Sequence, residues 1–296
     1  MTAHPTSIPA TPDIAIIGAG VVGLWCALKA KQRGLSAVIV ESGRIGQGAS
    51  GGILGALMPH RPVSWEDIQV FQLEALLSLE TELAELETAT GLSCGYSRCG
   101  RVMPIDSDEF LAEHEQWQAG ATRLWPAVSR TGQSISWDIR RGEPAPGWPV
   151  LKPGFVAYSF DTLSARINPR RFVKALLAAV QPEVVVAENC PVETITDNSE
   201  VLLENGTRLS PGRVIVAAGH ESFGLLQPHL KCELGWGVKG QAVLLRPKGR
   251  SFDDMPFIYS RGIYLVAHDD GLVAVGSTSQ RDYRNTGVDE VVSQKL

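Results

Sequence analysis

The chain of 296 residues is 44% hydrophobic and 20% charged, proportions that are typical of a soluble protein with a sizeable core and room for two domains. Its formal net charge is −5 and it has no basic run, so we expect no nucleic-acid partner. No apolar stretch is long enough to cross a bilayer, and we therefore expect no membrane span.

The N-terminal tail and the cysteines add no site. Residues 1–12 are rich in Thr and Pro and lack the apolar core of a signal peptide, which predicts a loose tail. The five cysteines are odd in number and scattered, and Cys94 and Cys99 have no matching metal ligands elsewhere. We therefore expect reduced thiols, a cytoplasmic location and no metal.

A glycine motif near the N-terminus predicts a strand–helix–strand unit that binds a dinucleotide. An apolar run leads directly into Gly18-x-Gly20-x-x-Gly23, and an amphipathic segment follows. Gly18 permits the tight turn out of the strand, Gly20 lets the backbone approach a pyrophosphate, and Gly23 lets the helix pack on the strand. The helix that begins near Val21 then directs its free N–H groups at the phosphates.

The next predicted strand ends in an acidic residue. Residues 37–40 are apolar and run into Glu41, which lies 18 residues beyond Gly23. A carboxylate at this position accepts hydrogen bonds from a ribose hydroxyl and argues against the 2′-phosphate of NADP. The alternative interpretation of the whole segment is a glycine-rich turn without a ligand.

Residues 42–52 form a second stretch of small residues, which favours a flavin. A ribityl chain and an isoalloxazine ring lie against bare backbone, and Ser50 with nearby N–H groups can contact a pyrophosphate. The apolar residues 53–58 suit a wall beside the flavin ring. The alternatives are a flexible surface loop or an NAD-dependent dehydrogenase, and the second leaves residues 46–52 without a role.

A long helix is expected after Ser64, which forms a capping box with Asp67, and it should end at Gly91. Its predicted buried face consists of Ile68, Phe71, Ala75, Leu79, Leu83 and Leu86. A strand over 101–105, a helix over 106–118 that starts from Asp106, an irregular stretch over 141–153 and a strand over 154–160 are then expected.

The pattern is clearer from Asn168, which caps a helix with Pro169 at its first position. Strands are expected over 184–187, 192–196 and 201–204, with Asn205-Gly206 as a hairpin turn. Residues 214–219 read as a central parallel strand that runs into small residues beside a cofactor. Four closely spaced strands, over 239–246, 255–259, 264–268 and 272–276, predict a separate antiparallel sheet.

The order of these motifs resembles the D-amino acid oxidase superfamily of FAD-dependent oxidoreductases, which includes glycine oxidase and sarcosine oxidase. The residues that carry the resemblance are Gly18-x-Gly20-x-x-Gly23, Glu41, Gly48-Ala49-Ser50, Asn168-Pro169, 214–219, Gly240-Gln241 and Val275-Gly276-Ser277-Thr278. The resemblance implies an α/β fold, α+β overall, with a GR2-type FAD-binding Rossmann-like domain and an antiparallel-sheet substrate domain. We expect residues 13–60 and 161–231 in the first domain and residues 61–160 and 232–285 in the second.

The resemblance also implies which residues contact FAD. These are Gly18, Gly20, Val21, Val22, Gly23, Glu41, Ser42, Arg44, Gly48, Ala49, Ser50, Gly52, Ile53, Leu54, Val192, Ala217, Ala218 and Gly219. Tyr264 matches the place of a pocket tyrosine in glycine oxidase-like proteins, and residues 56–60 match the flank of the isoalloxazine. We therefore take Tyr264 and His60 as candidate catalytic residues, and Met58, Tyr259 and Tyr264 as candidate substrate contacts.

Each of these pocket residues also has a structural interpretation. Tyr259 and Tyr264 can be half-buried sheet tyrosines. His60 and Arg61 can line the pocket, although a solvent-facing pair in a loop is the favoured interpretation. His268 borders a turn and is expected at the surface.

The implied reaction is hydride transfer from the carbon beside a neutral amine to flavin N5, which gives an imine that water hydrolyses. We thus expect an FAD-dependent oxidoreductase that acts on the C–N bond of a small amine or amino acid, and a homo-oligomer is left open. Family members continue through a Gly-Leu-Arg-Pro-like segment and a glycine-rich motif that do not occur here. We expect residues 286–296 to begin a truncated C-terminal helix, and the alternative function is an inactive FAD-binding fragment or a subunit that needs a partner chain.

Overall fold

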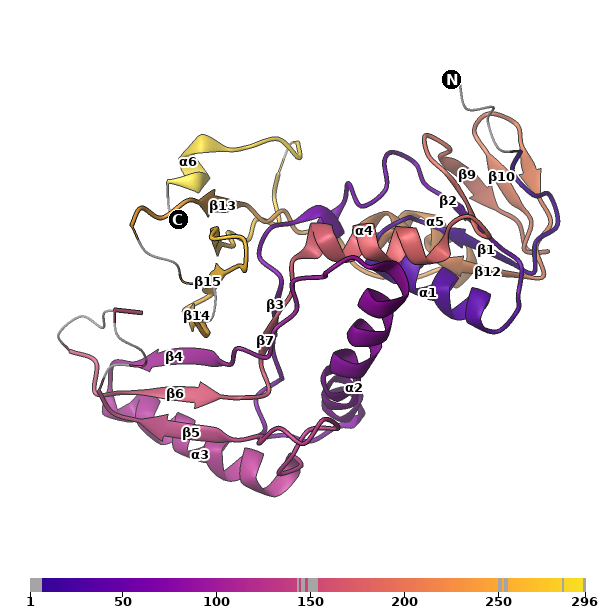
Figure 1. Cartoon of the computed structure of the whole chain (residues 1–296). Helices are drawn as coiled ribbons and strands as arrows, with labels where there is room; N and C mark the ends of the chain where they lie inside the picture. Colours follow the sequence, from indigo (N-terminus) through magenta and orange to yellow (C-terminus); the bar gives the residue numbers. More distant parts are fainter. Residues whose placement is uncertain are drawn as a thin grey trace. The chain divides into compact units, whose positions relative to one another are not determined.

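The computed structural model describes residues 7–142, 144, 147–148, 154–249, 252, 255–283 and 285–294 (Figure 1). The chain forms two compact units, each assembled from separated segments. Unit 1 consists of Met1–Gly52, Ala89–Leu92 and Pro169–Val238, and unit 2 consists of Ile53–Thr88, Ser93–Asn168 and Lys239–Leu296. Residues 53–60 and 161–168 lie in unit 2 because β3 (Ala56–Leu57) pairs there with β7 (Ala165–Arg166).

The centre of unit 1 is a four-stranded parallel sheet in the order β12-β1-β2-β8. Its strands are β1 (Ile14–Ile17), β2 (Ala37–Val40), β8 (Val185–Ala187) and β12 (Arg213–Val216). β1 and β2 are buried almost throughout, as expected for the middle strands of a parallel sheet. α1 (Val21–Gln32) and α4 (Pro169–Val180) pack together, with the rings of Trp25 and Phe172 5.6 Å apart.

β12 lies at the edge of this sheet, so the expectation of a central strand is wrong. The apolar sequence of β12 is explained by packing outside this sheet, because Val214 and Val216 pack on a core cluster that also contains Val201 and Leu203. These last residues belong to an antiparallel sheet of β9 (Val192–Ile195), β10 (Val201–Leu203) and β11 (Arg208–Leu209). The predicted hairpin turn is confirmed, since Gly206 has a φ of +84° and donates to the Leu203 carbonyl.

Unit 2 contains a seven-stranded sheet in the order β13-β16-β15-β14-β4-β6-β5. Its strands are β4 (Arg101–Ile105), β5 (Trp137–Arg140), β6 (Ala157–Asp161), β13 (Ala242–Leu245), β14 (Phe257–Ser260), β15 (Ile263–Ala267) and β16 (Val273–Gly276). The four strands from the second half of the chain are antiparallel, as predicted. β14 then pairs with β4 in parallel, which joins them to the strands of the first half.

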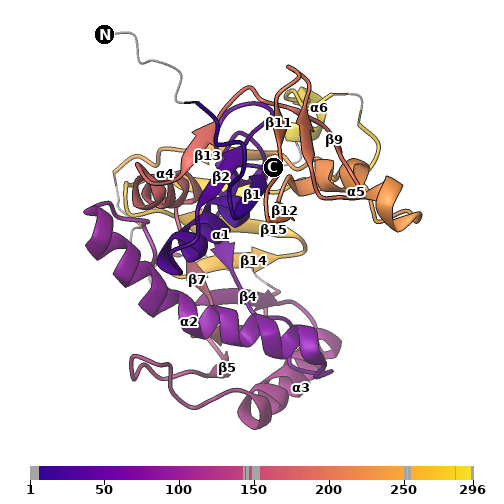
Figure 2. The ribbon, with the colours of Figure 1, turned by 90° about the vertical axis from the view of Figure 1, so that its right-hand side faces the viewer.

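The core of unit 2 is built where α2 (Asp67–Thr90) and α3 (Asp108–Leu124) meet the sheet (Figure 2). Leu73, Leu76 and Leu77 of α2 pack in one cluster with Trp117 of α3 and Trp137 of β5. The short α6 (Glu290–Ser293) lies within the predicted C-terminal helical segment.

The predicted buried face of α2 is wrong in its first turns. Ile68 and Phe71 are 54% and 73% exposed, whereas Leu73, Leu76 and Leu77 are buried. Apolar residues are so frequent between residues 68 and 79 that two helical phases fit the sequence equally well. Packing against the Trp117 and Trp137 cluster selects the second phase.

α3 begins two residues later than predicted and extends to Leu124. Ser107 is its N-cap, because the Ser107 hydroxyl accepts a hydrogen bond of 3.1 Å from the Phe110 N–H. Asp106, which we expected to be the cap, instead forms an ion pair with Arg261. Part of the predicted irregular stretch over 141–153, and residues 1–6 of the predicted tail, lie outside the described residues.

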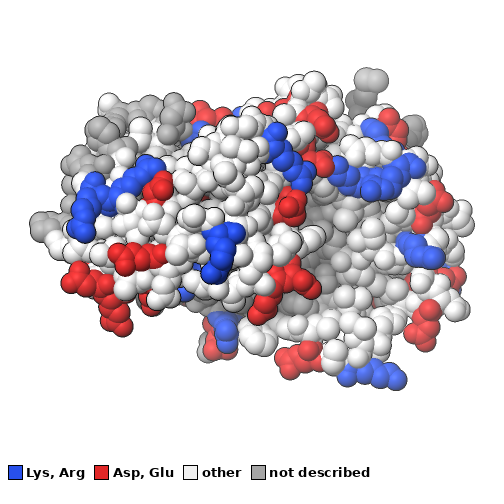
Figure 3. All heavy atoms as spheres, turned by 90° about the horizontal axis from the view of Figure 1, so that it is seen from below, with Lys and Arg blue, Asp and Glu red and all other residues white. Residues whose placement is uncertain are grey.

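Charged side chains of both signs are interspersed over the face seen in Figure 3. None of the described helices has the length and apolarity that a membrane span requires. Within the described ranges, no group of three or more His, Cys, Asp or Glu residues is placed to hold a metal ion.

One buried group gives the fold a pH dependence that can be measured. His114 is fully buried, and its Nδ1 lies 2.5 Å from the Ser159 hydroxyl oxygen. Burial, followed by the charges of Arg101 and Arg61, lowers the pKa of His114 from 6.5 to about 4. The unfolded chain therefore takes up this proton first as the pH falls.

We expect the stability from neutral His114 to be complete above pH 6.5 and to be lost between pH 6.5 and about 4. A His114→Gln variant keeps a polar partner for Ser159 but cannot titrate. Its thermal midpoint should fall less steeply than that of the wild type over this interval, and equal slopes would exclude His114 as the cause.

Candidate functional site

Two glycines near the start of α1 occupy positions where a side chain cannot fit. A Cβ on Gly23 would lie 1.9 Å from the Gly18 carbonyl oxygen, and a Cβ on Gly18 would lie 2.5 Å from the Ala217 carbonyl oxygen. Gly18 also has a φ of +105°, which favours glycine. The resulting turn presents bare backbone at the N-terminus of α1, as the sequence motif predicts.

The second glycine-rich stretch folds back onto this helix N-terminus. Gly20 is the N-cap of α1 and has no side chain to offer, so the Ser50 hydroxyl accepts a hydrogen bond of 3.0 Å from the Val21 N–H. Ser50 lies in the short helix η1 (Ala49–Gly51), whose Gly51 carbonyl accepts from Arg170 Nε at 2.9 Å. These contacts place residues 49–51 beside the first motif and exclude a free surface loop.

Glu41 lies at the same edge of the sheet with both carboxylate oxygens in use. Oε2 accepts from the Ala19 N–H at 2.8 Å, and Oε1 accepts from the Gly43 N–H at 2.9 Å. Oε1 also accepts from the Ser42 hydroxyl at 3.4 Å, whereas Oε2 keeps a second lone pair, which can accept from a ribose hydroxyl. The Glu41 carbonyl also accepts from the Cys190 N–H at 2.8 Å, which brings the segment before Val192 to this end of the sheet.

Residues 217–219 complete the cluster in unit 1. The Ala217 N–H donates to the Ile17 carbonyl at 2.7 Å, and the Ala218 Cα would lie 2.9 Å from a Cβ on Gly18. Gly219, with a φ of +60°, starts η2 (Gly219–Glu221), whose Glu221 carboxylate lies 3.4 Å from the Ser42 hydroxyl. The structure thus gathers four segments that are far apart in the sequence.

The other predicted FAD contacts differ in their exposure and in the unit to which they belong. Val22 is 60% exposed on α1, and Arg44, Gly48 and Gly52 are exposed near η1. Ile53 and Leu54 belong to unit 2, where they pack on a cluster formed by Phe257, Val266 and Ala274.

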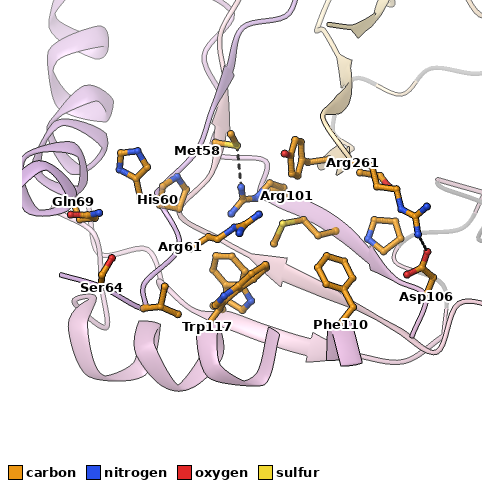
Figure 4. A pocket seen from close by; sticks show the side chains of 17 residues that line it. Met58, His60, Arg61, Ser64, Gln69, Arg101, Asp106, Phe110, Trp117 and Arg261 are labelled. Carbon is orange, nitrogen blue, oxygen red and sulfur yellow. Dashed lines mark hydrogen bonds and ion pairs between the residues drawn. The ribbon is translucent and has the colours of Figure 1, made fainter. Parts of the chain in front are cut away.

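Unit 2 contains a cavity of about 380 Å³ (Figure 4). The residues that line it are Met58, Pro59, His60, Arg61, Val63, Ser64, Gln69, Arg101, Met103, Pro104, Asp106, Phe110, Trp117, Trp137, Tyr259, Ser260 and Arg261. Two of the three predicted substrate contacts, Met58 and Tyr259, are among them. His60 also lines the cavity although its side chain is exposed, so the two interpretations of this residue are compatible.

Tyr264 does not line the cavity, but it contacts Met58 and Tyr259, which do. Its hydroxyl is 3.7 Å from the Met58 sulfur, and its ring centroid is 4.8 Å from that of Tyr259. Burial is the main factor that raises the pKa of Tyr264, so its hydroxyl stays protonated at neutral pH. The half-buried sheet tyrosine that we considered as an alternative describes this position well.

Sequence reasoning missed the charged centre of the cavity. Arg101 is 3% exposed, and its Nε donates to Asp161 Oδ2 at 2.7 Å. These residues are 60 positions apart but directly opposite each other in the pairing of β4 with β6. The sequence did contain a signal for this ion pair, namely a lone arginine in an otherwise apolar strand. Such an arginine requires a buried partner.

His268 is buried and not at the surface, so that expectation is wrong. It is 2% exposed, and its Nε2 lies 2.8 Å from the Ile53 carbonyl oxygen. The neighbouring Ala267 carbonyl accepts from Arg166 Nη1 at 2.7 Å. Asp269 and Asp270 of the following turn are exposed, whereas Val266 and Ala267 at the end of β15 are buried.

Known proteins provide an independent comparison. Residues 13–296 match the DAO family, described as FAD dependent oxidoreductase. The chain is 27% identical over 282 residues to the bifunctional protein ThiO/ThiG of Synechocystis sp., covering 92% of this chain and 39% of that protein. It is 26% identical to a glycine oxidase of Pseudomonas aeruginosa, covering 94% of this chain and 74% of that protein.

The fold is shared with solved structures. The glycine oxidase from Geobacillus kaustophilus superposes with a TM-score of 0.84 at 20% sequence identity, over 97% of this chain and 76% of that one. The predicted combination of an FAD-binding Rossmann-like sheet with an antiparallel sheet is therefore confirmed. The chain spans about two fifths of the length of the first curated relatives that it matches.

The close contact at Gly23 generates a test of the cofactor site. In a Gly23→Ala variant, we expect FAD affinity to fall roughly tenfold or more, because overpacking of about 1–3 kcal/mol must displace α1 from the turn. Titration of the FAD-free protein with FAD, followed by flavin fluorescence, measures the effect.

The matched control is Gly224→Ala in α5 (Ser222–Leu230), where the added Cβ meets no heavy atom within 4 Å. This variant should bind FAD like the wild type. Equal affinity of the Gly23→Ala variant and the control would exclude the turn as the cofactor site.

Proposed function

The chain belongs to the DAO family of FAD-dependent oxidoreductases, and from this premise we propose that it oxidises the carbon–nitrogen bond of a small amine or amino acid. The observation that carries the proposal is the convergence of residues 18–23, Glu41, residues 49–51 and residues 217–219 in unit 1. We propose that unit 1 binds FAD and that the cavity of unit 2 takes the substrate.

The residues of unit 1 fit the requirements of FAD. The N-terminus of α1 offers backbone N–H groups and a positive dipole end to a diphosphate. The Ser50 hydroxyl accepts from Val21, so its own proton remains to be donated to a phosphate oxygen. Glu41 Oε2 can accept from a ribose hydroxyl, and Gly20, the N-cap of α1, has no side chain at the helix N-terminus.

When bound, FAD supplies the acceptor for a hydride from the carbon beside the amine, and the resulting imine is hydrolysed by water. The residues of this chain must hold the substrate and keep its amine neutral. Arg61 and Arg101, which line the cavity, disfavour a nearby ammonium, since like charges lower its pKa. The same two charges contribute to the lowered pKa of His114.

We also propose a cytoplasmic location, which is supported by five cysteines that form no disulfide in the described part of the chain. Glycine is a candidate substrate because one relative is named a glycine oxidase.

The test is an anaerobic titration. The chain, purified and loaded with FAD, should show the visible flavin bands, and a suitable amine should bleach them as two electrons enter the flavin. Glycine, sarcosine, D-alanine and D-phenylalanine are suitable probes, and free FAD with the same amines is the control. Absence of flavin binding would contradict the cofactor assignment, and bound flavin that no amine bleaches would contradict the oxidase proposal.

A further inference from the structure

One wall of the cavity in unit 2 comes from a short segment between β3 and α2. The cavity residues from this segment are Met58, Pro59, His60, Arg61, Val63 and Ser64, and we call residues 58–64 the wall segment. The segment follows the end of β3 at Leu57 and precedes the start of α2 at Asp67, so neither a helix nor a strand fixes its position. Contacts with other elements must therefore hold it in place.

A tight turn gives the wall segment two sides. The Val63 N–H donates to the Arg61 carbonyl at 2.9 Å, which closes a three-residue turn around Pro62. Pro62 is buried, whereas Arg61 and Val63 on either side of it are exposed and line the cavity. The turn thus directs Pro62 into the protein while its two neighbours form the wall.

Pro62 packs against a glycine of α3. A Cβ on Gly120 would lie 1.8 Å from the Pro62 carbonyl oxygen, which is closer than the corresponding 1.9 Å at Gly23. Gly120 is buried within α3, where alanine would suit the helix itself better than glycine. The contact with the wall segment therefore explains why this position of the helix has no side chain.

Two further contacts hold the wall segment beside the turn. The Arg61 guanidinium lies 4.7 Å above the centre of the Trp117 ring, and Trp117 is on the same face of α3 as Gly120 (Figure 4). The His60 N–H donates to Gln72 Oε1 of α2 at 2.6 Å. The wall segment is thus held by α3 and α2 together.

We propose that Gly120 is a positioning residue for the substrate, because its missing side chain sets how closely the wall segment approaches α3 and hence the size of the molecule that the cavity accepts. With a Cβ at this position the Pro62 carbonyl has to move away from α3, and Arg61 and Val63 move with it because the turn joins them. The wall then leaves Trp117 and the cavity widens. The inference rests on the proposed function, since it concerns the substrate cavity of that reaction.

The first experiment follows the wall segment and needs no substrate. Hydrogen–deuterium exchange of the FAD-loaded protein, read by mass spectrometry, reports the amides of His60 and Val63 in one peptide. In Gly120→Ala we expect this peptide to exchange about tenfold faster than in the wild type, because the overpacked contact has to open. Gly224→Ala, whose Cβ meets no heavy atom within 4 Å, is the control and should exchange like the wild type.

A second pair of variants loosens the wall segment without adding bulk to α3. Gln72→Leu removes the acceptor of the His60 N–H, and we expect severalfold faster exchange of the same peptide. Gln72→Glu keeps an acceptor oxygen and should restore the exchange of the wild type. Thermal unfolding shows whether each variant is folded, and this pair keeps the inference testable should Gly120→Ala fail to fold.

The second experiment measures the size preference of the cavity apart from the reaction. The probes are 2-aminoisobutyrate and α-methylphenylalanine, which have no hydrogen on the carbon beside the amine and so cannot donate a hydride. Each is titrated into the FAD-loaded protein by calorimetry. In Gly120→Ala and Gln72→Leu we expect the affinity for the larger probe relative to the smaller one to rise about threefold or more, because the displaced wall leaves more room.

A merely structural role for Gly120 would lower the thermal midpoint and leave this relative affinity unchanged. Wild-type exchange of the wall segment in a folded Gly120→Ala protein would overturn the inference, and so would faster exchange with an unchanged preference in Gly120→Ala or Gln72→Leu. Failure of both probes to bind the wild type would overturn it together with the cavity as the substrate site. If exchange and preference change as expected but no amine bleaches the flavin, the proposed function alone is contradicted.

Discussion

Unit 1 depends on the absence of a side chain at Gly23. The first turn of α1 approaches the Gly18 carbonyl so closely that a Cβ would lie 1.9 Å from that oxygen. This approach fixes the helix N-terminus above the end of β1, and Ser50 and Ala19 then find their hydrogen-bond partners at Val21 and Glu41. The other segments of the candidate cofactor site are arranged around this one steric condition.

In unit 2 the corresponding element is the ion pair of Arg101 with Asp161 across β4 and β6. A guanidinium is planar and carries five N–H donors in a fixed fork, so fixing Nε on Asp161 also fixes the direction of Nη1 and Nη2. Met58 accepts from Nη1, and the aromatic ring of Trp137 lies beside the group. The polarity of the cavity wall therefore follows from one contact made behind it.

The sequence predicted the parts of the molecule that depend on local patterns. The glycine motif, the hairpin at Gly206 and the strands of both sheets except β5 follow from backbone requirements and from the distribution of apolar residues. The edge position of β12 and the buried face of α2 could not be read in the same way, because several arrangements bury those residues equally well. Only tertiary packing brings Arg101 together with Asp161, Trp117 and Trp137. In the same way, His268 is buried in a contact with the distant Ile53 carbonyl.

Stability alone does not explain a charged pair in the core of unit 2. Removing two charges from water costs about as much as their attraction returns, so well-packed apolar residues would serve the fold at least as well. The charge of Arg101, after burial and together with the charge of Arg61, also lowers the pKa of His114. What the pair does provide is a guanidinium held rigidly in place, with one nitrogen unused by the described residues and with Asp161 offsetting its charge from behind.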